Sequence, residues 1–106
     1  MQATIQSKAT LEAQLEKNTL TLVDFYADWC GPCQMIASYW GELKEEFSEQ
    51  VTFVKVNVEE EKELARAYGV SALPTMKFFH GKEEGEEIRG AVPKALLAHK
   101  IKQKLS

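Results

Sequence analysis

Two cysteines separated by two residues, Cys30 and Cys33, are the side chains of this 106-residue sequence best suited to chemistry. They stand in the segment Trp29-Cys30-Gly31-Pro32-Cys33. A thiolate attacks disulfides, and a neighbouring pair of thiols can alternate between a dithiol and a disulfide. Residues three apart on one helical turn are neighbours, so the two sulfur atoms can bond with little backbone movement. The spacing therefore predicts thiol–disulfide exchange.

A buried strand and an amphipathic helix are expected to position this pair. The stretch Leu20–Ala27 is apolar on both alternating faces except for Asp24, which is typical of a strand buried on both sides. After the cysteines, apolar residues recur at helical spacing as far as about Ser48: Ile36, Trp40, Leu43 and Phe47. Pro32 suits the first helical turn. We therefore expect Cys30 at the exposed lip of a helix N-terminus and Cys33 one turn inside, where free N–H groups favour a thiolate.

Other uses of the cysteines remain open on the residues alone. A structural disulfide closing so short a loop would stabilise the fold by only about 2 kcal/mol in the chain-entropy model. A zinc site needs four ligands, or three plus water, and His80 and His99 are far away in the sequence without ligand spacing. A pair that bridges two chains through a metal or cluster is a third alternative. The predicted helix N-terminus favours the redox use over these, with no metal bound.

Composition limits the class of protein. A chain of 106 residues with 44% hydrophobic and 27% charged residues suits one soluble domain spanning residues 1–106. The net charge of −3 argues against nucleic acid as a partner. We expect no signal peptide and no membrane span, because apolar runs of the needed length are missing. Two cysteines confined to one motif favour a reducing compartment, which is the cytoplasm or, for a mature organelle protein, the organelle.

The rest of the chain predicts alternating strands and helices. A short strand at 3–6 precedes a helix capped by Ser7 that ends near Asn18. A second buried strand spans Val51–Val58, and a helix with an acidic first turn spans Glu59–Tyr68 and ends at Gly69.

A hairpin and a last helix complete the prediction. The strand Thr75–Phe79 leads to a turn bracketed by Gly81 and Gly85, and Glu86–Arg89 returns. Pro93 opens a final helix with an apolar side, and its lysines suit the dipole at its C-terminus: Leu96, Leu97, Ile101 and Leu105, then Lys100, Lys102 and Lys104. This order predicts an α/β fold with a central mixed β-sheet flanked by helices on both faces.

The residues resemble the thioredoxin family over essentially the whole chain. Val23–Cys33 matches the family's active-site stretch almost in full, and Trp-Cys-Gly-Pro-Cys in this context is highly specific. Further matches follow in family order: Lys55, Leu73-Pro74-Thr75, Gly81 and Gly90-Ala91. The resemblance implies the thioredoxin fold and a protein dithiol–disulfide oxidoreductase.

The resemblance also implies a role for each matching residue. Cys30 resembles the attacking nucleophile, and Cys33 resembles the resolving thiol. Asp24 resembles the family's proton-handling carboxylate, Lys55 its charged neighbour, and Pro74 a cis-proline that faces the site. The residues implied to bind a protein substrate are Trp29, Gly31, Pro32, Ala72, Leu73, Pro74, Arg89 and Gly90.

On the residues alone, purely structural roles remain open for several of these positions. Asp24 could be a satisfied structural acid, Lys55 a packing residue, Trp29 a core residue and Pro74 an ordinary trans-proline. A carboxylate on a doubly buried strand is nevertheless costly, so we predict that burial raises the pKa of Asp24 and outweighs an opposing Lys55.

Three positions depart from the usual family pattern. Ser38 stands where many members carry a helix-kinking proline, so we predict a straighter helix here. Ala72 replaces a frequent glycine or methionine, and Arg89 replaces a frequent apolar residue. These two differences bear on the choice of partner.

The implied activity is the general reduction of protein disulfides by a monomer. No cofactor is expected, because the electrons travel on the two sulfur atoms, and a separate thioredoxin reductase would restore the dithiol. An oxidase or isomerase of a secretory compartment is a rival, although Gly31-Pro32 is typical of reducing members. A binding subunit or processivity factor without thiol turnover is another.

Overall fold

The computed structural model describes residues 3–4, 8–17 and 19–106. These residues form the predicted order of strands and helices. The strands are β1 (Ala3–Thr4), β2 (Leu20–Tyr26), β3 (Thr52–Asn57), β4 (Thr75–His80) and β5 (Glu83–Arg89). The helices are α1 (Lys8–Glu16), α2 (Gly31–Glu46), α3 (Lys62–Ala67) and α4 (Lys94–Leu105). The predicted cap at Ser7 and helix end near Asn18 lie outside the described residues.

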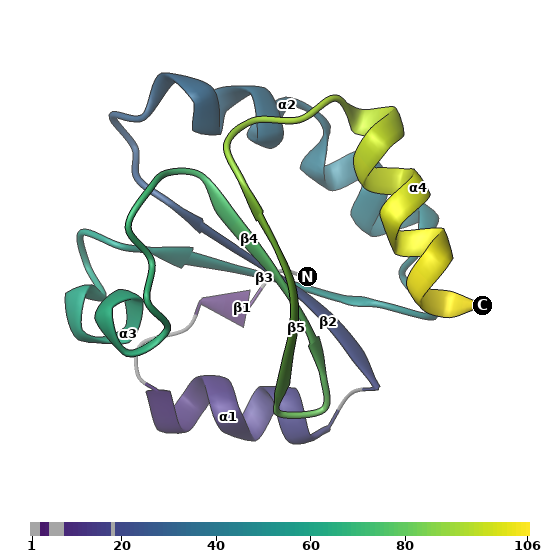
Figure 1. The fold of residues 1–106 in the computed structure, drawn as a ribbon, viewed down its shortest axis with the longest axis horizontal. Coiled ribbons are helices and arrows are strands. Elements are labelled where there is room, and N and C mark those ends of the chain that lie inside the picture. The colour runs from purple at the N-terminus through teal and green to yellow at the C-terminus, as the bar shows by residue number, and fades with distance from the viewer. Residues whose placement is uncertain (1–2, 5–7, 18) are drawn as a thin grey trace.

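The strands form one mixed sheet in the order β1-β3-β2-β4-β5 (Figure 1). β1 and β2 run parallel to β3, whereas β4 runs antiparallel to β2 and β5. The predicted mixed sheet is confirmed. β2, which leads to the cysteines, is the central strand, and its register pairs Asp24 with Lys55 on β3 and with Met76 on β4.

Helices cover both faces of this sheet, α2 and α4 on one and α1 and α3 on the other (Figure 1). Successive side chains of β2 enter two different cores, as the period of two requires. Leu20 and Leu22 pack beneath α2 and α4, while Val23 and Phe25 pack beneath α1 and α3. The same alternation places Asp24 on the α2 side, behind the helix that carries the cysteines.

Two predicted boundaries are wrong. α3 begins at Lys62 rather than Glu59, because the Asn57 side chain accepts hydrogen bonds from the backbone N–H groups of Glu59 (2.9 Å) and Glu60 (3.3 Å) and holds them in a turn. β5 begins at Glu83, so Gly85 lies within the strand and not in the hairpin turn.

The predicted apolar side of α4 is only half right. Leu97 and Ile101 are buried, but Leu96 and Leu105 are 41% and 38% exposed, because they do not face α2 and the sheet. Two lysines of α4 also form ion pairs, in addition to their favourable position at the C-terminal end of the helix dipole. Lys100 and Lys104 both form ion pairs with Glu86 of β5 and so connect the last helix to the edge of the sheet.

Candidate active site

Cys30 and Cys33 form a disulfide at the N-terminus of α2. Their Cα atoms are 5.3 Å apart, a separation that one helical turn provides. Cys30 is the N-cap residue, and its Sγ accepts a hydrogen bond from the backbone N–H of Cys33 at 3.2 Å. Pro32 lies in the first turn, as predicted. The donors at this helix end would stabilise a negative charge on the Cys30 sulfur atom.

Both cysteines are buried to the same degree, but only Cys30 lies in the wall of a surface groove. Cys30 is 3% exposed and Cys33 is 4% exposed, so the prediction of Cys30 at an exposed lip is wrong. The physical reason is long-range packing, because Val58 and Leu73 from distant segments pack against the buried cluster that the two cysteines form with Ala27. Among the described residues, however, Cys30 lines a surface groove and Cys33 does not.

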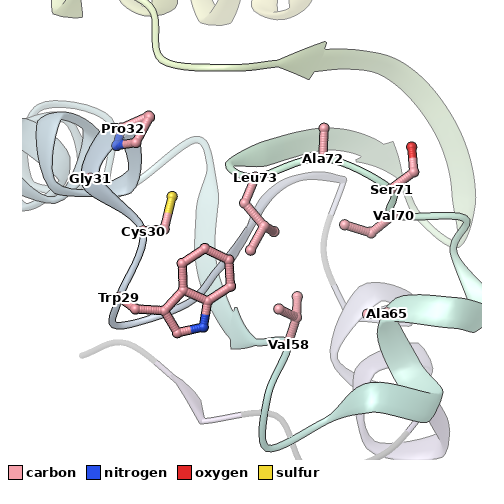
Figure 2. Close-up of a pocket in the computed structure, with 10 residues that line it drawn as sticks. All are labelled: Trp29, Cys30, Gly31, Pro32, Val58, Ala65, Val70, Ser71, Ala72 and Leu73. Atoms are coloured by element: carbon pink, nitrogen blue, oxygen red, sulfur yellow. The ribbon is translucent and has the colours of Figure 1, made fainter.

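That groove has a volume of about 490 Å³ and is mainly apolar (Figure 2). Trp29 is 68% exposed and forms part of its wall, which rules out a core role for this side chain. Figure 2 shows the indole of Trp29 and the side chain of Leu73 next to Cys30. The predicted residues that line the groove are Trp29, Cys30, Gly31, Pro32, Ala72 and Leu73.

Sequence analysis missed four lining residues, which are Val58, Ala65, Val70 and Ser71. Val70 and Ser71 directly precede Ala72, so their position in the chain could have identified them. Val58 follows β3 and Ala65 lies on α3, so only the tertiary arrangement of these segments around the cysteine loop brings both residues into the groove.

The other predicted substrate residues lie beside the groove rather than in it. The Leu73–Pro74 peptide bond is cis, as predicted, and Pro74 is buried. The Pro74 carbonyl accepts a hydrogen bond from the backbone N–H of Gly90 at 2.8 Å. Gly90 has a φ of 88°, which favours glycine. Arg89 is exposed and pairs with Glu87. Among the described residues that line the groove, Pro74, Arg89 and Gly90 are absent.

Asp24 lies on the face of β2 that α2 covers and is 1% exposed. Its Oδ1 atom has no hydrogen-bond partner among the described residues. Burial raises the pKa of Asp24 from its ordinary value of 3.8 to about 7, while the charge of Lys55 acts in the opposite direction. The prediction that burial outweighs Lys55 is therefore confirmed, and Asp24 can hold or release a proton near neutral pH.

Lys55 is half-buried, and its charge acts on Asp24, its neighbour across the sheet. Within the described residues no ion pair joins these two side chains, although their backbones are paired in register. The Lys55 ammonium instead lies 4.3 Å from the centre of the Tyr26 ring, in a cation–π contact. Tyr26 was not among the predicted site residues, and its place two residues from Asp24 on the same strand is the only hint in the sequence.

Two further properties bear on function. In the part of the chain that the structure describes, no cluster of three or more histidine, cysteine or acidic side chains could hold a metal ion. Of the helices in the same residues, none has the length and apolar character to cross a membrane.

Known proteins resemble this chain in sequence and in structure. A family model described as Thioredoxin matches residues 2–103. "Thioredoxin 1" of Synechococcus elongatus is 41% identical over 91 residues, which are 86% of this chain and 85% of that protein. "Thioredoxin M-type, chloroplastic" of Pisum sativum is 40% identical over 87% of this chain, and the match spans 54% of that longer protein. The X-ray structure of Fasciola hepatica thioredoxin superposes with a TM-score of 0.88 at 36% identity, covering 97% of this chain and 98% of that one.

Proposed function

Because the chain belongs to the thioredoxin family, whose members are protein dithiol–disulfide oxidoreductases, we propose that it reduces disulfides in other proteins through Cys30 and Cys33. One observation carries the proposal. The disulfide caps a helix N-terminus and meets the surface through Cys30, in an apolar groove that an extended segment of a substrate can occupy.

The reaction transfers two electrons in two exchange steps. In the reduced protein the Cys30 thiolate attacks one sulfur atom of the substrate disulfide, a mixed disulfide forms, and the other substrate sulfur leaves and takes up a proton. The Cys33 thiol then loses its proton and attacks the Cys30 sulfur atom. The Cys30–Cys33 disulfide forms, and the second substrate sulfur leaves as a thiol. The exchange needs no bound cofactor, because both electrons come from the two cysteine sulfur atoms.

Asp24 is the base we assign to the second step. A carboxylate with a pKa of about 7 can accept the Cys33 proton near neutral pH and release it afterwards. Lys55 adjusts this pKa downward through its charge, and the Tyr26 ring holds the ammonium close by. Trp29, Gly31, Pro32, Ala72 and Leu73 contact the substrate in the groove, with Pro74, Arg89 and Gly90 beside it.

A separate enzyme returns the electrons. We assign this role to a thioredoxin reductase and expect the protein to act as a monomer in a reducing compartment. That compartment is the cytoplasm or, given the chloroplastic relatives, an organelle. Disulfide-containing proteins are its substrates.

Capture of substrates tests the assigned roles. Cys33→Ser should hold target proteins as mixed disulfides, since the resolving thiol is gone, whereas the matched variant Cys30→Ser should hold none. Mass spectrometry of the proteins released by a reductant compares the two. Equal capture by both variants would contradict the assignment of Cys30 as the nucleophile.

Turnover tests the direction of the reaction. The wild-type protein should reduce insulin when it is coupled to NADPH and a thioredoxin reductase. A redox potential that lies well above that of the glutathione pool would favour an oxidase or isomerase, since 30 mV corresponds to about 1.4 kcal/mol for this couple. A double serine variant that keeps full biological activity would instead favour a binding subunit.

A further inference from the structure

Tyr39 joins the helix that carries the cysteines to a loop 53 residues further along the chain. Its side chain is 7% exposed and lies in the core between α2, α4 and the sheet. The hydroxyl group donates a hydrogen bond of 2.6 Å to the backbone carbonyl of Val92. Burial and the nearby carboxylate of Asp24 raise the pKa of Tyr39 to about 12, so the phenol keeps its proton and remains a donor at any physiological pH.

The loop that Tyr39 holds is the segment Gly90–Pro93 between β5 and α4. Its first residue is fixed to the cis-proline loop, since the Gly90 N–H donates to the Pro74 carbonyl at 2.8 Å. Its third residue, Val92, is fixed to α2 by Tyr39. Between these two bonds lies Ala91, which is half-buried and packs against the same core. The segment is therefore held from both sides of the site, by the helix that carries the cysteines and by the loop that carries Leu73.

A second contact between α2 and this region lies on the surface. Glu42, one turn after Tyr39, forms an exposed ion pair of 2.7 Å with Lys94 at the start of α4. An exposed ion pair contributes little to stability. Of these two polar contacts from α2, the buried hydroxyl of Tyr39 is therefore the one that can fix the position of the segment.

We propose that Tyr39 is a positioning residue for protein substrates: its hydrogen bond to the Val92 carbonyl fixes the segment Gly90–Pro93 next to the cis-proline loop, so that a bound polypeptide meets a preformed surface. The inference rests on the proposed function, which places Gly90 beside the bound substrate. Without the bond, the segment must be ordered when the substrate binds, and this cost weakens binding. The exchange chemistry at Cys30 and Cys33 involves neither Tyr39 nor Val92 and should be unaffected.

Tyr39→Phe isolates the hydroxyl group, because phenylalanine keeps the ring that packs in the core. The KM for insulin, with reductase and NADPH in excess, should rise about five-fold, the factor that one neutral hydrogen bond of about 1 kcal/mol represents. The kcat should stay within about two-fold, as should the rate with a small aromatic disulfide, which does not reach the segment. Glu42→Gln is the matched control, and its KM should change less than two-fold.

Folding is checked by the midpoint of urea denaturation. Tyr39→Leu, which removes both ring and hydroxyl, serves as a second variant and should raise the KM for insulin at least as much. An unchanged KM in Tyr39→Phe would overturn the inference, and so would an equal loss of rate with insulin and the small disulfide. If the wild-type protein reduces neither compound, the proposed function itself fails. If the wild type reduces both and Tyr39→Phe behaves like it, only the inference fails.

Discussion

Replacing Asp24 by asparagine should make the protein's stability much less dependent on pH. Asp24 is 1% exposed, and burial raises its pKa from 3.8 to about 7. The unfolded chain loses this proton near pH 4, whereas the folded protein keeps it until about pH 7. The contribution of Asp24 to the free energy of unfolding is therefore largest below pH 4, falls as the pH rises from 4 to 7, and stays low above pH 7. Asparagine has no proton to lose.

The size of the effect follows from the two pKa values. A difference between 3.8 and about 7 corresponds to about 4 kcal/mol at 1.36 kcal/mol per pH unit. Roughly 1.5 kcal/mol of this has already been lost at pH 5, so the stabilisation by Asp24→Asn should grow by about 3 kcal/mol between pH 5 and pH 9. The comparison across pH cancels the fixed cost of burying the amide group.

Urea denaturation of the oxidised wild-type and Asp24→Asn proteins, followed by circular dichroism from pH 4.5 to 9, measures this difference. Lys55→Met provides a directional control. Because the Lys55 charge lowers the pKa of Asp24, its removal should move the fall in stability to higher pH. Glu45→Gln, which removes an exposed carboxylate from α2, controls for net charge and should show less than about 1 kcal/mol of variation.

The same variant tests the assignment of Asp24 as a base. Single-turnover reduction of a protein disulfide should become slower above pH 7 when the carboxylate is replaced, because Cys33 then lacks its proton acceptor. A stability difference that is constant from pH 5 to pH 9 would refute the burial argument. A pH-dependent stability difference with an unaltered rate profile would leave Asp24 as a buried acid without a catalytic role.

Three further substitutions test the backbone. Ser38→Pro would remove an N–H bond in the middle of α2 and should cost about 3 kcal/mol in urea denaturation if the helix is straight; an unchanged midpoint would show a bend already present. Gly90→Ala should cost about 1–2 kcal/mol because its φ is 88°, and no cost would mean that the segment relaxes. Gly41→Ala, inside α2 with no atom close to the added Cβ, should instead stabilise by about 1 kcal/mol, and a loss would reveal an unforeseen contact.

The local features of the site could be predicted from the sequence. Cys30 and Cys33 lie one helical turn apart, and Pro32 marks the start of the helix that joins them, so their pairing depends on residues 29–33 alone. The burial of Asp24 follows from the apolar residues on both faces of its strand, and the direction of its pKa shift follows from that burial. The cis bond before Pro74 could be predicted only from the family resemblance, since spacing and composition do not distinguish a cis from a trans bond.

The contacts between segments that are distant in the sequence were decided only by the tertiary structure. Cys30 is buried in a cluster against which Val58 and Leu73 pack, and neither residue is near it in the sequence. The ammonium of Lys55 lies over the Tyr26 ring rather than against Asp24. Strand alternation places Tyr26 and Asp24 on the same face of β2, so the sequence does not show which of them Lys55 contacts. The bond from Tyr39 to Val92 joins residues 53 apart, and nothing in the pattern of either segment indicates it. The physical reason is common to all three. Periodicity places a side chain on a face of its own element, but the contact it makes there depends on how the elements pack.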